Sequence, residues 1–122
     1  MEINEYQKRA METCMESCNN LSYMLLNLVG EVGEFASKIA KQIRIGNLVI
    51  GSDKYPNCLL HAKDMKREDH NVINDELKKE AGDILWQLSG LCKVMGWDLE
   101  NVAQTNLDKL AARKAVGTID GD

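Results

Sequence analysis

The sequence predicts an all-α fold in a single domain of 122 residues. The chain contains one proline, and aromatic residues make up 5% of it, a composition that favours helices over strands. Apolar residues recur every three or four positions over long stretches, which is the spacing of one face of a helix. Gly46 and Gly96 follow two of these stretches and are expected to end the helices.

Four helices are expected, at residues 3–19, 21–44, 71–95 and 99–116. Asp98 precedes the last of them and is predicted to be its N-cap. Residues 46–69 contain turn signals around Pro56 and are expected to form an irregular connection. In the domain of residues 1–122, residues 116–122 are expected to be a flexible tail.

The second and third expected helices each carry a continuous apolar stripe. The stripe of residues 21–44 consists of Leu21, Leu25, Leu28, Val32, Phe35, Ile39 and Ile43. The stripe of residues 71–95 consists of Val72, Ile73, Leu77, Ala81, Ile84, Leu88, Leu91 and Met95. Trp86 projects to the opposite side of its helix and is predicted to be exposed in a single chain, which indicates a subunit interface or a base pocket.

Two acidic motifs lie on these same two helices, Glu31-x-x-Glu34 and Glu80-x-x-Asp83. A spacing of three residues puts both carboxylates of a motif on one side of the helix, about one turn apart. If the helices pack together, four carboxylates can converge, and their repulsion is relieved by a cation between them. All-oxygen ligands suit hard cations such as Mg²⁺, which often accompany phosphate substrates.

Glu80 is predicted to lie at the edge of the apolar stripe, where a carboxylate is costly to desolvate unless it is paired or binds a metal. The opposing interpretation is a solvated acidic column on an amphipathic helix, and spacing alone does not separate the two. Gly30 and Gly33 flank the acids of the first motif. They indicate close approach of a ligand or of another backbone, as at a tight helix crossing.

Asn106, Lys109 and Arg113 share one face of the expected helix at residues 99–116. A lysine and an arginine one turn apart can hold a polyphosphate, and an asparagine can add a hydrogen bond. A solvated face with cations placed favourably by the helix dipole explains the same pattern.

The charge and the cysteines limit the other functions. A net charge of −4 argues against binding nucleic acid polymers, and no apolar run reaches the length of a membrane span. The N-terminus is unlike a signal peptide, so we expect a cytoplasmic protein with reduced thiols. Cys14, Cys18, Cys58 and His61 could form a zinc site, but their spacing matches no recognised finger.

Three segments together resemble the MazG-like nucleoside triphosphate pyrophosphohydrolases of the all-α NTP pyrophosphatase group. They are residues 28–34, residues 79–86 and residues 106–113. Each is a weak signal alone, but their order, with a turn at Gly96 before the last, makes the resemblance specific. It covers most of the chain, although residues 47–69 do not align with the family pattern.

The resemblance implies a four-helix-bundle-like fold of antiparallel helices that assembles as a homodimer or homotetramer. It implies that Glu31, Glu34, Glu80 and Asp83 bind Mg²⁺, with Mn²⁺ as a possible substitute. It also implies the reaction NTP + water → NMP + pyrophosphate, and a role in removing unwanted nucleotides or adjusting a dNTP pool.

The same resemblance suggests roles for individual side chains. A carboxylate not fully used as a metal ligand can accept the proton of the attacking water. Glu34 is the preferred base, although the sequence does not separate it from Glu31. Lys38 and the cationic face at residues 106–113 are expected to contact the substrate.

Two other classes compete with this hypothesis. A di-iron carboxylate bundle uses Glu-x-x-His pairs, and neither Glu31 nor Glu80 has a histidine three residues later. A non-catalytic helical module that binds nucleotides or partners is the second alternative, and the intact carboxylates argue against it. Metal-dependent release of pyrophosphate would distinguish a hydrolase from such a module.

Overall fold

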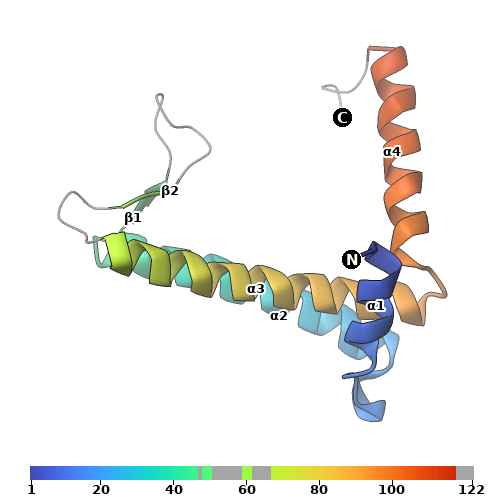
Figure 1. Cartoon of the computed structure of the whole chain (residues 1–122), viewed down its shortest axis with the longest axis horizontal. Coiled ribbons are helices and arrows are strands. Elements are labelled where there is room, and N and C mark those ends of the chain that lie inside the picture. The colour runs from blue at the N-terminus through green and yellow to red at the C-terminus, as the bar shows by residue number, and fades with distance from the viewer. Residues whose placement is uncertain (47, 51–58, 62–66, 118–122) are drawn as a thin grey trace. The chain divides into compact units, whose positions relative to one another are not determined.

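The computed structural model describes residues 1–46, 48–50, 59–61 and 67–117. Four α-helices dominate it, which confirms the all-α class: α1 (Ile3–Met11), α2 (Leu21–Arg44), α3 (Arg67–Val94) and α4 (Leu99–Ala115) (Figure 1). A short 3₁₀ helix, η1 (Glu16–Cys18), precedes α2. None of the described helices has the length and apolar character needed to cross a membrane.

The connection expected to be irregular contains two short strands, so that expectation was wrong in part. Strand β1 (Leu48–Ile50) pairs antiparallel with β2 (Leu59–His61), and Val49 lies opposite Leu60. Strand β1 is wholly apolar and β2 begins with two leucines, and such short apolar segments suit paired extended backbone. The predicted turn at Pro56 and residues 118–122 of the expected tail lie outside the described residues.

The first helix is shorter than the sequence predicted, because it ends at Met11 rather than near residue 19. Thr13 explains the early end, since its hydroxyl donates to the carbonyl of Ala10 at 2.6 Å and its N–H donates to the same oxygen at 3.0 Å. Such local bonds compete with continuation of a helix. The next long helix begins where Asn20 accepts a hydrogen bond from the N–H of Tyr23 at 2.8 Å.

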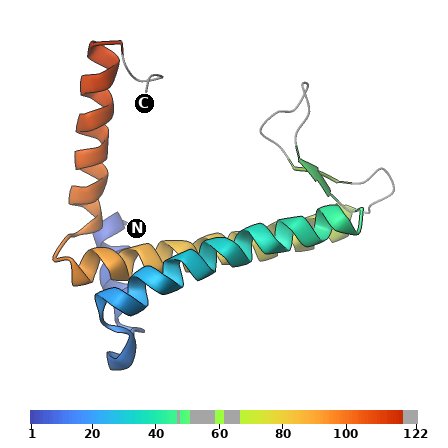
Figure 2. The ribbon, with the colours of Figure 1, turned by 180° about the vertical axis from the view of Figure 1, so that it is seen from behind.

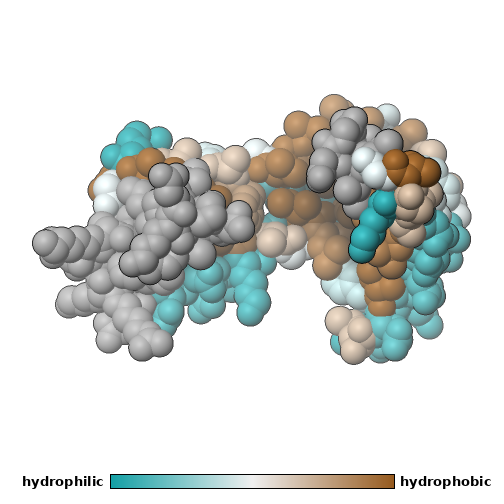
Figure 3. Space-filling model, turned by 90° about the horizontal axis from the view of Figure 1, so that it is seen from above, coloured by the Kyte–Doolittle hydropathy of each residue, from teal (hydrophilic) through white to brown (hydrophobic). Residues whose placement is uncertain are grey.

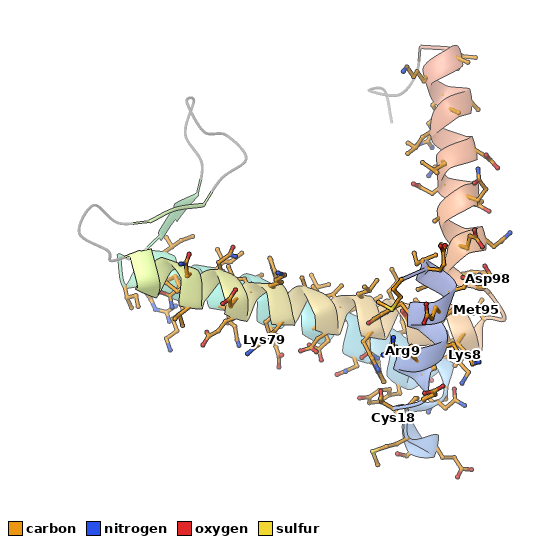
Figure 4. All side chains as sticks on the ribbon, viewed as in Figure 1. Lys8, Arg9, Cys18, Lys79, Met95 and Asp98 are labelled. Atoms are coloured by element: carbon orange, nitrogen blue, oxygen red, sulfur yellow. The ribbon has the colours of Figure 1, made fainter. Side chains whose placement is uncertain are left out.

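The predicted bounds of the remaining helices are close to those observed. Helix α3 begins at Arg67, about one turn before the predicted Asn71, and ends at Val94. Asp98 is the N-cap of α4, as predicted, and its side chain accepts from the N–H of Asn101 at 2.7 Å (Figure 4). Gly46 and Gly96 have positive φ angles of 81° and 77°, the conformation that ends helices at glycine.

The chain divides into two compact units. The unit Leu26–Leu85 contains most of α2 and α3 and the strand pair. In it, α2 and α3 lie side by side (Figures 1 and 2), since Nζ of Lys38 on α2 is 2.7 Å from Oε1 of Glu80 on α3. The other unit joins Met1–Leu25 to Trp86–Asp122 and contains α1 and α4.

A small core forms in the unit that contains α1. Ala10, Met11 and Met24 are buried, and Trp86 packs against them. The indole N–H of Trp86 donates to the carbonyl of Ala10 at 3.1 Å and to the hydroxyl of Thr13 at 2.9 Å. Trp86 is therefore half-buried by α1 of the same chain, so the prediction that it would be exposed in a single chain was wrong. A helical projection shows which side of α3 carries Trp86, but it does not show that α1 packs against that side.

A polar network ties α1 to the turn before α4 in the same unit. Gln7 is buried, and its amide donates to the carbonyl oxygens of Ser89 at 3.2 Å and Trp97 at 3.1 Å. Its side-chain oxygen accepts from the N–H of Leu99 at 3.1 Å. Every polar group of the Gln7 side chain therefore has a partner, which is the condition for burying an amide cheaply.

Candidate metal centre

Both acidic motifs lie in the unit Leu26–Leu85, one on α2 and the other on α3. Both segments are helical, so Glu31 lies one turn before Glu34, and Glu80 one turn before Asp83. Helices α2 and α3 lie side by side (Figures 1 and 2), which allows carboxylates from distant parts of the sequence to meet.

Three of the four predicted carboxylates come together. One side-chain oxygen from each of Glu31, Glu80 and Asp83 lies within 4.8 Å of the others, and we call these residues the acidic cluster. Glu80 is only 8% exposed, Glu31 is half-buried and Asp83 is exposed. Glu34 is exposed and does not belong to the cluster, although its charge acts on Glu31.

The two least exposed members of the cluster each have one oxygen with a partner and one without. The amide of Asn27 donates to Oε1 of Glu31 at 3.5 Å, and Nζ of Lys38 lies 2.7 Å from Oε1 of Glu80. Oε2 of Glu31 and Oε2 of Glu80 are buried and have no hydrogen-bond partner among the described residues. A buried oxygen without a partner costs about 1–3 kcal/mol, and more when it is charged.

Electrostatics in the cluster disfavour an ionised Glu31. Burial raises the pKa of Glu31 because it removes water from the carboxylate, and the charges of Glu34, Asp83 and Glu80 raise it further. The hydrogen bond from Asn27 opposes this shift. The carboxylates therefore repel one another at a place where a cation would relieve the repulsion.

The residues of the cluster fit a hard divalent cation. Carboxylate oxygens are the ligands that Mg²⁺ and Mn²⁺ prefer, and Mg²⁺ binds through few carboxylates while retaining water and substrate phosphates. The unpartnered buried oxygens of Glu31 and Glu80 are satisfied if they coordinate a cation. Glu31, Glu80 and Asp83 are therefore the residues that could hold it.

The predicted substrate-binding residues are divided between the two units. Lys38 is in the unit of the cluster and pairs with Glu80. Asn106, Lys109 and Arg113 lie on α4, in the other unit, so their contact with a substrate stays a prediction. Asn106 and Lys109 are exposed, and Arg113 is half-buried.

The alternative zinc site gains no support from the described residues. Cys14 and Cys18 are half-buried free thiols, and Cys92 is a buried free thiol. Cys58 lies outside the described residues. The group of metal-ligating side chains found in the described part of the chain is the acidic cluster.

Two contacts of the site were not predicted from the sequence. Asn27 lies four residues before Glu31, so the spacing of neighbours on a helix face could have indicated its hydrogen bond. The pair between Lys38 and Glu80 joins two helices, and no spacing within either helix signals it.

Comparison with known proteins shows the family to which the chain belongs. The family model described as the MazG nucleotide pyrophosphohydrolase domain matches residues 19–117, which include both acidic motifs. The "Gene 37 protein" of Mycobacterium phage L5 is 31% identical over 128 residues, covering 99% of this chain and 96% of the phage protein. No solved structure matches the chain. The chain belongs to the MazG nucleotide pyrophosphohydrolase family.

Proposed function

We propose that this protein is a Mg²⁺-dependent nucleotide pyrophosphohydrolase that converts a (d)NTP to a (d)NMP and pyrophosphate. The observation that carries the proposal is the acidic cluster, in which the buried Oε2 atoms of Glu31 and Glu80 find no partner in the part of the chain that the structure describes. A hydrolase of this family needs a cation at its carboxylates, and this cluster has the donors and the charge for one.

The chemistry assigns roles to the residues of the cluster. Glu31, Glu80 and Asp83 would hold the cation. When bound, Mg²⁺, or Mn²⁺ in its place, would polarise the α-phosphate and offset charge on the departing pyrophosphate. Water attacks the α-phosphorus, and the bond to the oxygen that bridges the α- and β-phosphates breaks.

Glu34 is our candidate for the base that accepts the proton of this water. It is exposed and lies outside the cluster, so its carboxylate is free of the ligand role that occupies the other three. Glu31 is the alternative base, because burial and the neighbouring carboxylates raise its pKa and so strengthen its hold on a proton. For the substrate, we propose contacts from Lys38 and from Asn106, Lys109 and Arg113.

We also propose that the protein is a homodimer or homotetramer. Three apolar side chains of α2 that the sequence pattern predicted to be buried are about half exposed in the single chain: Leu21 at 47%, Leu25 at 50% and Val32 at 49%. Their neighbours Leu26 and Val29 are more exposed, at 73% and 68%. Figure 3 shows that hydrophobic surface remains exposed on one face of the chain. Exposed apolar side chains of this kind are typical of a protein interface.

The biological role that suits this reaction is removal of non-standard nucleotides, or adjustment of a dNTP pool, in the cytoplasm. The alternative is a module that binds nucleotides or partners without turnover. Such a module would not explain why two buried carboxylate oxygens lack a partner among the described residues.

Release of pyrophosphate and of orthophosphate from a panel of NTPs and dNTPs, with Mg²⁺ or with a chelator, tests the proposal. We expect pyrophosphate from at least one nucleotide with Mg²⁺ and none with the chelator. Orthophosphate as the initial product would contradict the reaction class. Binding of a nucleotide without turnover under any metal condition would favour the non-catalytic module.

A further inference from the structure

The ion pair between Lys38 and Glu80 is unequal in burial. Nζ of Lys38 lies 2.7 Å from Oε1 of Glu80, but the lysine side chain is 46% exposed and the glutamate side chain 11% exposed. Lysine can move its ammonium into water at little cost because its stem is long and flexible. Glu80 has no such freedom, so separating the pair leaves a buried carboxylate that needs another positive charge.

A cavity of about 240 Å³ lies beside this pair. Its lining comes from Lys38, Lys41 and Gln42 of α2 and from Ile73, Glu76 and Leu77 of α3. Lys38 thus borders both the acidic cluster and the cavity. Lys41 lies three residues after Lys38, so both lysines share one helix face and both line the cavity. Two ammonium groups against the single carboxylate of Glu76 leave this cavity with a net positive charge, which suits a phosphate group.

We propose that Lys38 is a displaceable counter-ion, which neutralises Glu80 until a divalent cation binds the acidic cluster and then turns to a phosphate in the adjoining cavity. This inference rests on the proposed function and deepens it, because it assigns an order of events to the site. Lys38 is a positioning residue for the metal and a binding residue for the substrate.

The charges of the site account for this exchange. A cation bound by Glu31, Glu80 and Asp83 neutralises the carboxylate that holds Lys38. The same cation repels the nearby ammonium, so both effects weaken the pair. The freed ammonium remains beside Glu76 and Lys41 at the cavity, where a phosphate can offer it a new partner. Binding of metal therefore prepares the phosphate site, and the pair stabilises the protein while metal is absent.

Binding of Mn²⁺ alone tests the first half of the proposal. The free Mn²⁺ signal in electron paramagnetic resonance would be titrated with wild type, Lys38→Met and Lys41→Met. Because Lys38→Met removes the competing ammonium, we expect it to bind Mn²⁺ about three- to fivefold more tightly than wild type. This factor corresponds to the free energy of a partly exposed ion pair, which the metal no longer has to break. Lys41→Met removes the same charge from the same helix face but no partner of Glu80, and it controls for general electrostatics.

Binding of inorganic triphosphate at saturating Mg²⁺, measured by calorimetry, tests the second half. We expect Lys38→Met to bind it about tenfold more weakly, since a charged hydrogen bond to phosphate is lost. Lys38→Arg should retain most of the affinity. Lys79→Met is the control, because Lys79 projects outward from α3 (Figure 4) and does not line the cavity.

Tighter binding of Mn²⁺ together with weaker binding of triphosphate in Lys38→Met would identify the exchange. A merely structural role of Lys38 would weaken both kinds of binding. Equal Mn²⁺ affinity in Lys38→Met and Lys41→Met, or weaker Mn²⁺ binding in Lys38→Met, would overturn the proposal while leaving the proposed function intact. Wild-type protein that binds no Mn²⁺ would overturn both. If Lys38→Met does not fold, Lys38→Gln gives the same comparison with a hydrogen-bond donor retained.

Discussion

Met24 of α2 lies against the bare backbone of Gly90 of α3, and a β-carbon at Gly90 would overlap the sulfur and methyl group of Met24. Met24 is fully buried. The amide of Gln87 donates to the carbonyl oxygen of Met24 at 3.4 Å and approaches its sulfur at 3.3 Å. Helices α2 and α3 therefore come into close contact here because Gly90 lacks a side chain and Met24 fills the space.

We predict that Gly90→Ala destabilises the protein, although alanine is the better helix former. The gain in helix propensity is about 1 kcal/mol, while overpacking a core costs about 1–3 kcal/mol. We expect a net loss of about 1 kcal/mol in the free energy of unfolding, measured by urea denaturation. Gly82→Ala is the matched control on the same helix, because its β-carbon would meet none of the described atoms within 4 Å. A stabilised Gly90→Ala variant would show that Met24 can move aside.

Replacing Glu80 by glutamine should abolish turnover and leave the helical content largely unchanged. The two side chains are nearly isosteric, but the amide removes one negative charge and one oxygen from the acidic cluster. It should also remove the rise in melting temperature that Mg²⁺ gives the wild type, since binding to the folded state stabilises it. Circular dichroism provides the folding control. Near-normal activity in this variant would refute the site assignment.

The pKa of Glu31 predicts how stability without metal depends on pH. The folded state holds the proton of Glu31 more tightly than the unfolded state does, because the pKa is raised. The contribution of Glu31 to stability is therefore full below the ordinary pKa of glutamate, and it is lost as pH rises through the raised value. Glu31→Gln should flatten this dependence and raise the melting temperature of the metal-free protein at neutral pH. An identical pH dependence in wild type and variant would contradict this cause.

Assembly through the exposed apolar side chains of α2 predicts a specific sensitivity to charge. Val29 is 68% exposed in the single chain, and Val29→Lys would bury an unpaired ammonium in the interface. We expect the subunit dissociation constant to rise at least about tenfold, since an uncompensated buried charge costs about 3–5 kcal/mol. Val116→Lys is the control, because Val116 is as exposed as Val29 but lies at the end of α4 and not among the apolar side chains of α2. Light scattering after size-exclusion chromatography gives the mass, and a monomeric wild type would contradict assembly.

Residue spacing predicted the long helices well because helix periodicity is a local property. The bounds of α2 and the N-cap Asp98 agree with the sequence, and Glu80 is buried at the edge of the stripe, as expected. The sequence overextended α1 because the hydroxyl of Thr13 competes with the helix, an effect that apolar spacing does not report.

The sequence did not indicate which glycine lies in close contact with another helix. Gly30 and Gly33 suggested a close approach of another backbone or of a ligand, but a β-carbon at Gly33 would meet none of the described residues within 4 Å, so no described backbone comes close there. Of the described residues, a β-carbon at Gly30 would meet Asn27 at an ordinary 3.7 Å. The close approach occurs at Gly90 instead, which nothing in its local sequence distinguishes from the others.

The sequence by itself determined the all-α class, the positions of α2, α3 and α4, and the presence of four carboxylates at helical spacing. The tertiary structure decided that Glu31, Glu80 and Asp83 meet while Glu34 stays outside, and that Lys38 faces Glu80. The first set depends on residues one turn apart, whose geometry the helix fixes. The second depends on how α2 and α3 are rotated and aligned against each other, which is set by the packing of many side chains together.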